Sequence, residues 1–266
     1  MAAPRLNEPW HRLRPESLRM LREDIEEHYP TLHVIVGEDD IVRVAGMFPV
    51  RDAEGTCIDG YEVRLDLPPD YPRGLPEVYE TGGRIPWTDK RHVNTDGTAC
   101  VMMPEERHRI WPRGEPLSRY LDGPLRNFFL GQLARDHDDP WPFDEWSHGE
   151  EGFNEFVQQE LGSSDPIVIR RFLWLLQDNP VSYRKPCPCG SHRQTRDCCR
   201  SKIVVLRRVV SRDRVWRHLV WLMTTPTVRE VLSTSGTTKS LSSWCARMSV
   251  LKSTSSIPVN SLEGVA

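Results

Sequence analysis

Four of the seven cysteines lie within thirteen residues of one another, at Cys187, Cys189, Cys198 and Cys199. A structural zinc ion takes four thiolate or imidazole ligands at the corners of a tetrahedron. A Cys-x-Cys turn and an adjacent Cys-Cys pair can supply all four, and a glycine after the first pair permits a tight turn. The sequence therefore predicts a closed, structural zinc site, with His192 as an alternative ligand.

Cys100 is the other cysteine whose surroundings suggest chemistry. It follows a Gly-Thr-Ala turn within an irregular stretch, 84–116, rich in glycine and proline. A thiolate is both a good nucleophile and a good leaving group, so an accessible cysteine can carry an acyl group as a thioester. The alternative is a small buried hydrophobe, which is the commoner role of a lone cysteine. Cys57 and Cys245 have no comparable surroundings and are predicted to be inert.

The string HVNTDGTACV contains His92, Asn94, Gly97 and Cys100. It resembles the His-Pro-Asn motif, glycine and active-site cysteine of ubiquitin-conjugating enzymes, and the strings around it occur in the order found in that family. LPPDYPRGLPEV precedes it, and Trp111-Pro112 and Asp138-Asp139-Pro140 follow it. Residues 15–140 thus resemble the ubiquitin-conjugating (UBC) family, which implies an antiparallel sheet flanked by helices.

The resemblance implies a thioester on Cys100 and roles for three neighbours. Asn94 would donate its amide to the oxyanion or brace the loop, and His92 would hold the loop by hydrogen bonds. Asp139 would orient an attacking amine or help to deprotonate it. Val93 in place of the family's proline, a shortened gap before the cysteine and the charged insert PEERHR after it indicate a divergent bacterial member.

A second tryptophan-containing passage, EWSHGEEGF, follows the acidic turn. His148 in this passage could line the active cleft or cap the helix that follows. We expect the second role, with Phe143 and Trp146 covering the edge of the core, since lone histidines are commonly structural.

The string CPCGSHRQTRDCC resembles the SEC-C zinc motif, which supports the zinc assignment. Its surroundings are basic, because residues 184–218 hold 11 Lys and Arg against 2 Asp, whereas residues 1–183 hold 20 against 34 acidic residues. This asymmetry suggests two functional units. The basic region could dock an acidic protein surface or nucleic acid, and the lack of an aromatic stacking platform favours protein. It could equally pack on the acidic half of the chain or serve solubility.

The fold class predicted is α+β: a UBC-like antiparallel sheet of about four strands flanked by helices, plus a small zinc module. Helices are expected at 15–28, at 117–134 with an interruption at Gly123-Pro124, at 149–162, at 166–179 and over 202–223, and strands within 32–50 and 57–69. The predicted divisions are a UBC-like domain (1–140), a helical extension (141–183), a SEC-C-like zinc module (184–205) and a basic helix with a Ser/Thr-rich tail (206–266).

Composition is that of an ordinary globular protein, with 38% hydrophobic and 27% charged residues. No apolar stretch is long enough to cross a bilayer, and the N-terminus lacks the apolar core of a secretory signal. We therefore predict a cytoplasmic protein with no membrane association. The odd number of cysteines and their dense cluster also argue against a secreted disulfide framework.

The predicted function is transfer of a protein C-terminus or a ubiquitin-like modifier through Cys100 to a target amine. The chain contains neither a G-x-G-x-x-G motif after a strand nor a P-loop, so activation by ATP would need a separate activating enzyme. Resemblance to bacterial UBC-like proteins implies an anti-phage operon with a nucleotidyltransferase as substrate. The alternatives are a non-catalytic UBC-variant or RWD-like adaptor, and a protein whose zinc module is the functional part.

Overall fold

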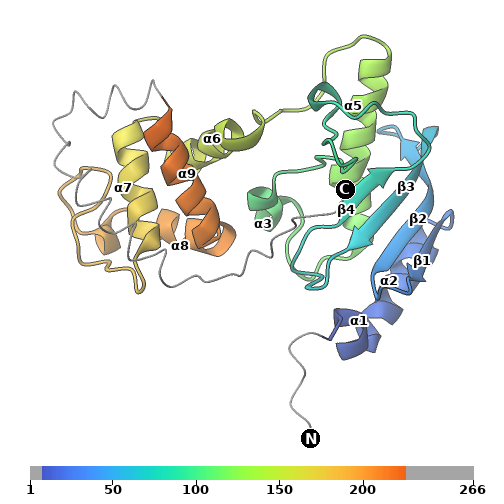
Figure 1. Cartoon of the computed structure of the whole chain (residues 1–266), viewed down its shortest axis with the longest axis horizontal. Coiled ribbons are helices and arrows are strands. Elements are labelled where there is room, and N and C mark those ends of the chain that lie inside the picture. Colours follow the sequence, from blue (N-terminus) through green and yellow to red (C-terminus); the bar gives the residue numbers. More distant parts are fainter. Residues whose placement is uncertain (1–7, 226–266) are drawn as a thin grey trace, which may run out of the picture. The chain divides into compact units, whose positions relative to one another are not determined.

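Alternating apolar residues in the first half of the chain form a four-stranded antiparallel sheet in the computed structural model of this protein (Figure 1). The strands are β1 (Leu32–Val36), β2 (Val42–Arg51), β3 (Cys57–Leu67) and β4 (Glu77–Glu80), and they lie in this order. The structure describes residues 8–225. The predicted α+β fold is confirmed, and the short fourth strand begins at the end of the Pro-rich passage LPPDYPRGLPEV (67–78).

The buried face of the sheet packs against helices. Tyr61 and its alternate neighbours in β3 are buried, as the period of two predicts, while the intervening Glu62 is exposed. Helices α2 (Pro15–His28) and α5 (Arg126–Asp136) contribute to the same core. Phe129 of α5 stacks on Tyr61 with ring centroids 4.4 Å apart. The core therefore ties the sheet to the helix that precedes the acidic turn.

The predicted helix 117–134 is continuous, although Gly123-Pro124 was expected to interrupt it. It consists of α4 (Leu117–Tyr120), a π-helical turn η3 (Leu121–Leu125) and α5. Pro124 has no N–H to donate and its ring would clash with the preceding turn of a regular α-helix. The wider π turn accommodates it without ending the helix.

The stretch 84–116 is a loop, as predicted. It also contains three short helical turns that were not predicted: η1 (Asp89–Arg91), η2 (Pro104–Glu106) and α3 (Arg107–Ile110). Arg107 is buried and donates to the backbone carbonyls of Pro72, Arg73 and Gly74. Its guanidinium also lies 4.4 Å from the centroid of the Trp111 ring. The charged insert after Cys100 is thus anchored to the Pro-rich passage by one arginine.

Contacts divide the chain into two compact units, 1–152 and 153–266, so the division falls inside the predicted helical extension 141–183. The second unit is helical where the structure describes it. Its elements are α6 (Gly149–Leu161, which begins in the first unit), α7 (Pro166–Gln177), η4 (Thr195–Asp197), α8 (Arg200–Val209) and α9 (Arg212–Thr224). The first unit also contains a short helix before α2, α1 (Trp10–Leu13).

Helices α7 and α9 run side by side in the second unit (Figure 1). The basic stretch 202–223, expected as one helical segment, is split between α8 and α9, because Ser211 accepts a hydrogen bond from the N–H of Arg214 (3.1 Å) and starts a new helix. The Ser/Thr-rich tail after residue 225 lies outside the described residues. Over residues 8–225, every helix is too short or too polar to cross a bilayer.

Replacement of Arg107 by leucine should destabilise the protein by about 3 kcal/mol, since it removes a buried guanidinium that donates to three backbone carbonyls. Arg107→Lys should recover only part of this loss, because an ammonium group lacks the planar fork that reaches several carbonyls. Urea denaturation of the intact chain, followed by tryptophan fluorescence, measures the free energy of unfolding of both variants. The control is Arg119→Leu, an exposed arginine with one surface ion pair. Equal effects of Arg107→Leu and Arg119→Leu would contradict the anchoring role.

Candidate functional site

Cys100 is positioned by an extension of the sheet. The N–H of Ala99 donates to the carbonyl of Val78 in β4 (2.8 Å), which continues antiparallel pairing just before the cysteine. The N–H of Cys100 donates to the carbonyl of His92 (2.7 Å) and closes the loop. Cys100 itself is exposed. An ordered backbone therefore presents this thiol at the surface of the first unit.

The six residues before Cys100 form a tight turn. Asn94 donates its backbone N–H to Thr98 (2.9 Å), Gly97 donates to Asn94 (3.0 Å), and Thr98 forms a bridge with Tyr79. Gly97 has a left-handed φ of +83°, and a Cβ at this position would lie 2.8 Å from the Trp87 ring. Only glycine satisfies both the conformation and the close approach.

The side chain of Asn94 is held in one orientation. Its Nδ2 donates to the Thr98 hydroxyl (2.9 Å), and that hydroxyl donates its single proton to Asp96 (2.6 Å). The carbonyl Oδ1 of Asn94 therefore faces Cys100, which donates to it from Sγ (3.4 Å). Of the two roles predicted for Asn94, this geometry favours bracing the loop over donation to an oxyanion.

His92 connects the cysteine loop to the segment after α5. Its backbone is left-handed (φ 52°), and its Nε2 lies 3.0 Å from an Oε1 of Glu145. Its ring centroid lies 4.6 Å from that of Trp141 and 5.1 Å from that of His148. This agrees with the predicted role of His92 in holding the loop. It also brings His148 against the loop, which was the less favoured of its two predicted positions.

The residue before His92 anchors the loop on α5. Arg91 donates to the backbone carbonyl of Gln132 (3.1 Å) and to Asp136 (2.6 Å). Gln132 is fully buried and donates its Nε2 to the carbonyl of Arg91 (2.7 Å). Neither Arg91 nor Gln132 was predicted from the sequence to belong to the site. A glutamine among Phe128, Phe129 and Gly131 on a core-facing helix was the available signal.

Asp139 stands apart from the other predicted catalytic residues. It is exposed in the turn after α5 and donates its backbone N–H to Ala134 (2.9 Å). Within residues 8–225, no hydrogen bond or ion pair joins its side chain to Cys100, His92 or Asn94. The structure thus groups three of the four predicted residues and leaves Asp139 free in solvent.

Burial by the surrounding loop raises the pKa of the Cys100 thiol above its usual value, even though the residue is exposed overall. The hydrogen bond to Asn94 opposes this increase in pKa, whereas the carboxylates of Asp89 and Asp96 add to it. The backbone N–H groups of Met102 and Met103, two and three residues further along the chain, form no backbone–backbone hydrogen bond within residues 8–225. The loop therefore combines a thiol of raised pKa with two backbone donors that no other backbone group engages.

The four clustered cysteines form a group that could hold a metal ion. Their Sγ atoms all lie within 4.8 Å of one another, with 3.6 Å between Cys189 and Cys198 and 3.7 Å between Cys198 and Cys199. Tetrahedral thiolate coordination with bonds of about 2.3 Å has sulfur–sulfur edges of about 3.8 Å. Cys187 completes the group, whereas the alternative ligand His192 is exposed and lies outside it.

Local backbone bonds build this cysteine group. Cys187 accepts from the N–H of Gly190 (3.1 Å), and Gly190 adopts a left-handed φ of +81° that a side chain would disfavour. The N–H of Cys187 donates to the carbonyl of Arg193 (2.7 Å). Thr195 is buried and its hydroxyl donates to the carbonyl of Lys185 (3.0 Å). These hydrogen bonds join residues that lie close together in the chain.

Comparison with protein-family models, with curated proteins and with solved structures gave no match. The chemistry assigned to the Cys100 site and to the cysteine group therefore depends on the residues and the geometry described above.

Alkylation of Cys100 by iodoacetamide should accelerate about tenfold per pH unit between pH 7 and 8, because only the thiolate reacts and its pKa is raised. The Asp89→Asn variant should react faster at pH 7, since it removes a negative charge that disfavours the thiolate. Peptide mass spectrometry resolves Cys100 from the other thiols, and Asp40→Asn is the control for a carboxylate elsewhere on the first unit. A rate that does not change with pH would contradict the raised pKa.

Proposed function

We propose that this protein is a cysteine acyl carrier of the ubiquitin-conjugating type, with Cys100 as the nucleophile. The observation that carries the proposal is an exposed thiol at the end of an ordered turn, held by β4 on one side and by His92 on the other. The four-stranded α+β fold and the string HVNTDGTACV support it. Such a carrier needs accurate placement of one sulfur more than it needs a deep pocket.

Two successive acyl transfers make up the proposed reaction. The Cys100 thiolate attacks the carbonyl carbon of a donor thioester, and the tetrahedral intermediate collapses with loss of the donor thiolate. A target amine then attacks the Cys100 thioester and loses a proton, and the Cys100 thiolate leaves. Neither step involves oxidation, and the first exchanges one thioester for another, so the protein contributes mainly position and charge stabilisation.

Different residues near Cys100 would position the loop, bind the oxyanion and contact the amine. Asn94 and His92 would position the loop, because their polar groups are bound within it or to Glu145. The backbone N–H groups after the cysteine are the candidates for the oxyanion. Asp139, exposed on the turn after α5, would meet an incoming amine only once a substrate is bound.

The proposed substrates are proteins. The acyl group would come from a protein C-terminus or a ubiquitin-like modifier, supplied by a separate activating enzyme if ATP is required. A nucleotidyltransferase C-terminus in an anti-phage system is the proposed partner, and the cytoplasm the proposed compartment. Nucleic acid and membranes have no part in the reaction.

We also propose that the cysteine group holds a structural zinc ion. Four thiolates suit a soft cation, and zinc accepts the tetrahedral arrangement without redox chemistry. Cys187, Cys189, Cys198 and Cys199 would be the ligands, leaving no coordination position for a substrate.

A second candidate function is a non-catalytic adaptor of the UBC-variant or RWD-like type. The raised pKa of the Cys100 thiol favours it, because a neutral thiol is a poor nucleophile at neutral pH. In this function the fold would bind a partner protein, with the zinc module as a docking element.

Co-expression with neighbouring genes should yield a covalent adduct on wild-type protein that a thiol reductant removes. Cys100→Ser should give a reductant-stable oxyester, and Cys100→Ala should give no adduct. Non-reducing electrophoresis followed by mass spectrometry identifies the bond and the attached chain. The matched control is Cys57→Ser, since Cys57 is also exposed and free. An adduct or conjugation activity that survives Cys100→Ala would refute the carrier function, and a stable non-covalent complex alone would favour the adaptor.

Purified protein should contain about one equivalent of zinc, as a four-thiolate site requires. The Cys198→Ser/Cys199→Ser double variant should lose that zinc and, with it, thermal stability of the second unit, because metal binding contributes directly to folding in such modules. Elemental analysis by mass spectrometry and differential scanning calorimetry measure the two effects, with Cys57→Ser as control. Full zinc content in the double variant would exclude this ligand set.

A further inference from the structure

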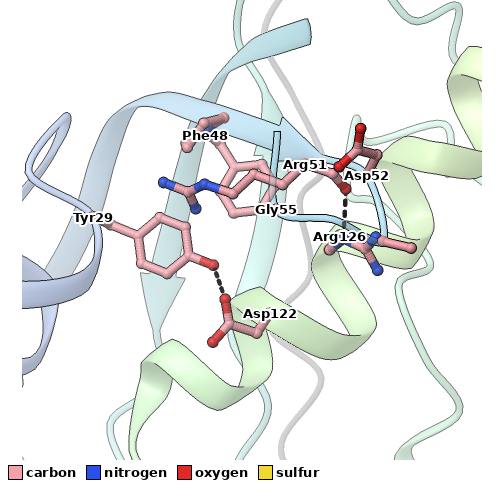
Figure 2. Close-up of a pocket in the computed structure, with 9 residues that line it drawn as sticks. Tyr29, Phe48, Arg51, Asp52, Gly55, Asp122 and Arg126 are labelled. Atoms are coloured by element: carbon pink, nitrogen blue, oxygen red, sulfur yellow. Dashed lines mark hydrogen bonds between the residues drawn. The ribbon is translucent and has the colours of Figure 1, made fainter. Parts of the chain in front are cut away.

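A cavity of about 330 Å³ opens in the first unit where the end of α2, the end of β2 and the start of α5 meet (Figure 2). Its lining consists of Tyr29, Phe48, Pro49, Arg51, Asp52, Ala53, Gly55, Asp122 and Arg126. The volume is at the lower end of the range of roughly 300–1,000 Å³ that ligand pockets span. None of these residues takes part in the cysteine loop or the metal site.

Two arginines in this cavity have unused hydrogen-bonding groups. Arg126 donates its Nε to the backbone carbonyl of Arg51 (2.6 Å), and the Arg51 guanidinium lies 5.5 Å from the centroid of the Tyr29 ring (Figure 2). Both side chains are half-buried. Within residues 8–225 neither guanidinium forms an ion pair with a carboxylate, so most of their N–H groups have no protein acceptor.

The two carboxylates of the cavity already have partners. Asp122 accepts a hydrogen bond from the Tyr29 hydroxyl (2.5 Å), which Figure 2 shows as a dashed line. Asp52 accepts backbone hydrogen bonds from Glu54 (3.1 Å) and Thr56 (2.8 Å) within the turn between β2 and β3. Each carboxylate uses one oxygen in these bonds and keeps its negative charge, so the unpaired hydrogen-bond donors that the cavity offers to a ligand are those of Arg51 and Arg126.

Guanidinium groups match planar or tetrahedral oxyanions, because their paired N–H groups bind two oxygens at once. Partial burial strengthens such a contact relative to one on an open surface. We propose that this cavity binds the oxyanion group of a small ligand, either a carboxylate or a phosphate, through Arg51 and Arg126. The apolar atoms of Phe48 and Pro49 would contact the remainder of the ligand.

Titration calorimetry on the intact chain tests the site with inorganic phosphate and with acetate, at an ionic strength held constant with chloride. Arg51→Gln and Arg126→Gln should each weaken binding of the preferred anion about tenfold, since each removes charge-assisted hydrogen bonds. Arg119→Gln, an exposed arginine on α4, is the control and should bind as the wild type does. Preference for phosphate or for acetate identifies the ligand's group.

The Asp122→Asn variant is expected to strengthen anion binding, and it leaves both guanidinium groups in place. It keeps an acceptor for the Tyr29 hydroxyl but removes a negative charge, so the anion should bind a few-fold more tightly. Cys100→Ala should leave binding unchanged, which separates this site from the acyl carrier. No binding of either anion, equal binding by wild type and Arg51→Gln, or weaker binding by Asp122→Asn would each overturn the proposal.

Discussion

The loop that carries Cys100 depends on the buried side-chain amide of Gln132, which must find hydrogen-bond partners. A glutamine side chain enclosed among aromatic residues on a helix costs about 1–3 kcal/mol if its polar atoms stay unsatisfied. Here its partner is the backbone of Arg91, and Arg91 returns hydrogen bonds to the helix. This reciprocal pair docks an irregular loop on α5, and the residue that follows, His92, supplies the carbonyl that receives the N–H of Cys100.

An irregular stretch of more than thirty residues must satisfy its backbone groups without regular secondary structure. The loop 84–116 pairs with β4 and donates to α5 through Arg91, and its buried Arg107 attaches it to the Pro-rich passage. Between them the chain turns sharply at Gly97. The result is an exposed thiol on a firmly held support, which is the arrangement that acyl transfer requires.

The two cysteine sites are built in different ways. The metal-binding group comes from one short segment whose four ligands lie between residues 187 and 199, with bracing hydrogen bonds from Lys185, Gly190 and Thr195 close to them in the chain. The Cys100 site collects groups from β4, the loop, α5 and the segment after it. The four ligands of the metal-binding group are close together in the chain. The residues around the Cys100 thiol come together only when the sheet and α5 pack against each other.

Features that depend on neighbours along the chain can be predicted from the sequence. The helix Pro15–His28, the alternation in β3 and the cysteine spacing follow from periodicity and from ligand chemistry, and the structure agrees with each. Tertiary structure alone decided how Asn94 points, that Glu145 and His148 lie against His92, and that two arginines face one cavity. Contacts such as the one between His92 and Glu145 join residues 53 positions apart. Local propensity carries no information about such pairs, because packing and the need to satisfy buried polar groups select them only in the folded chain.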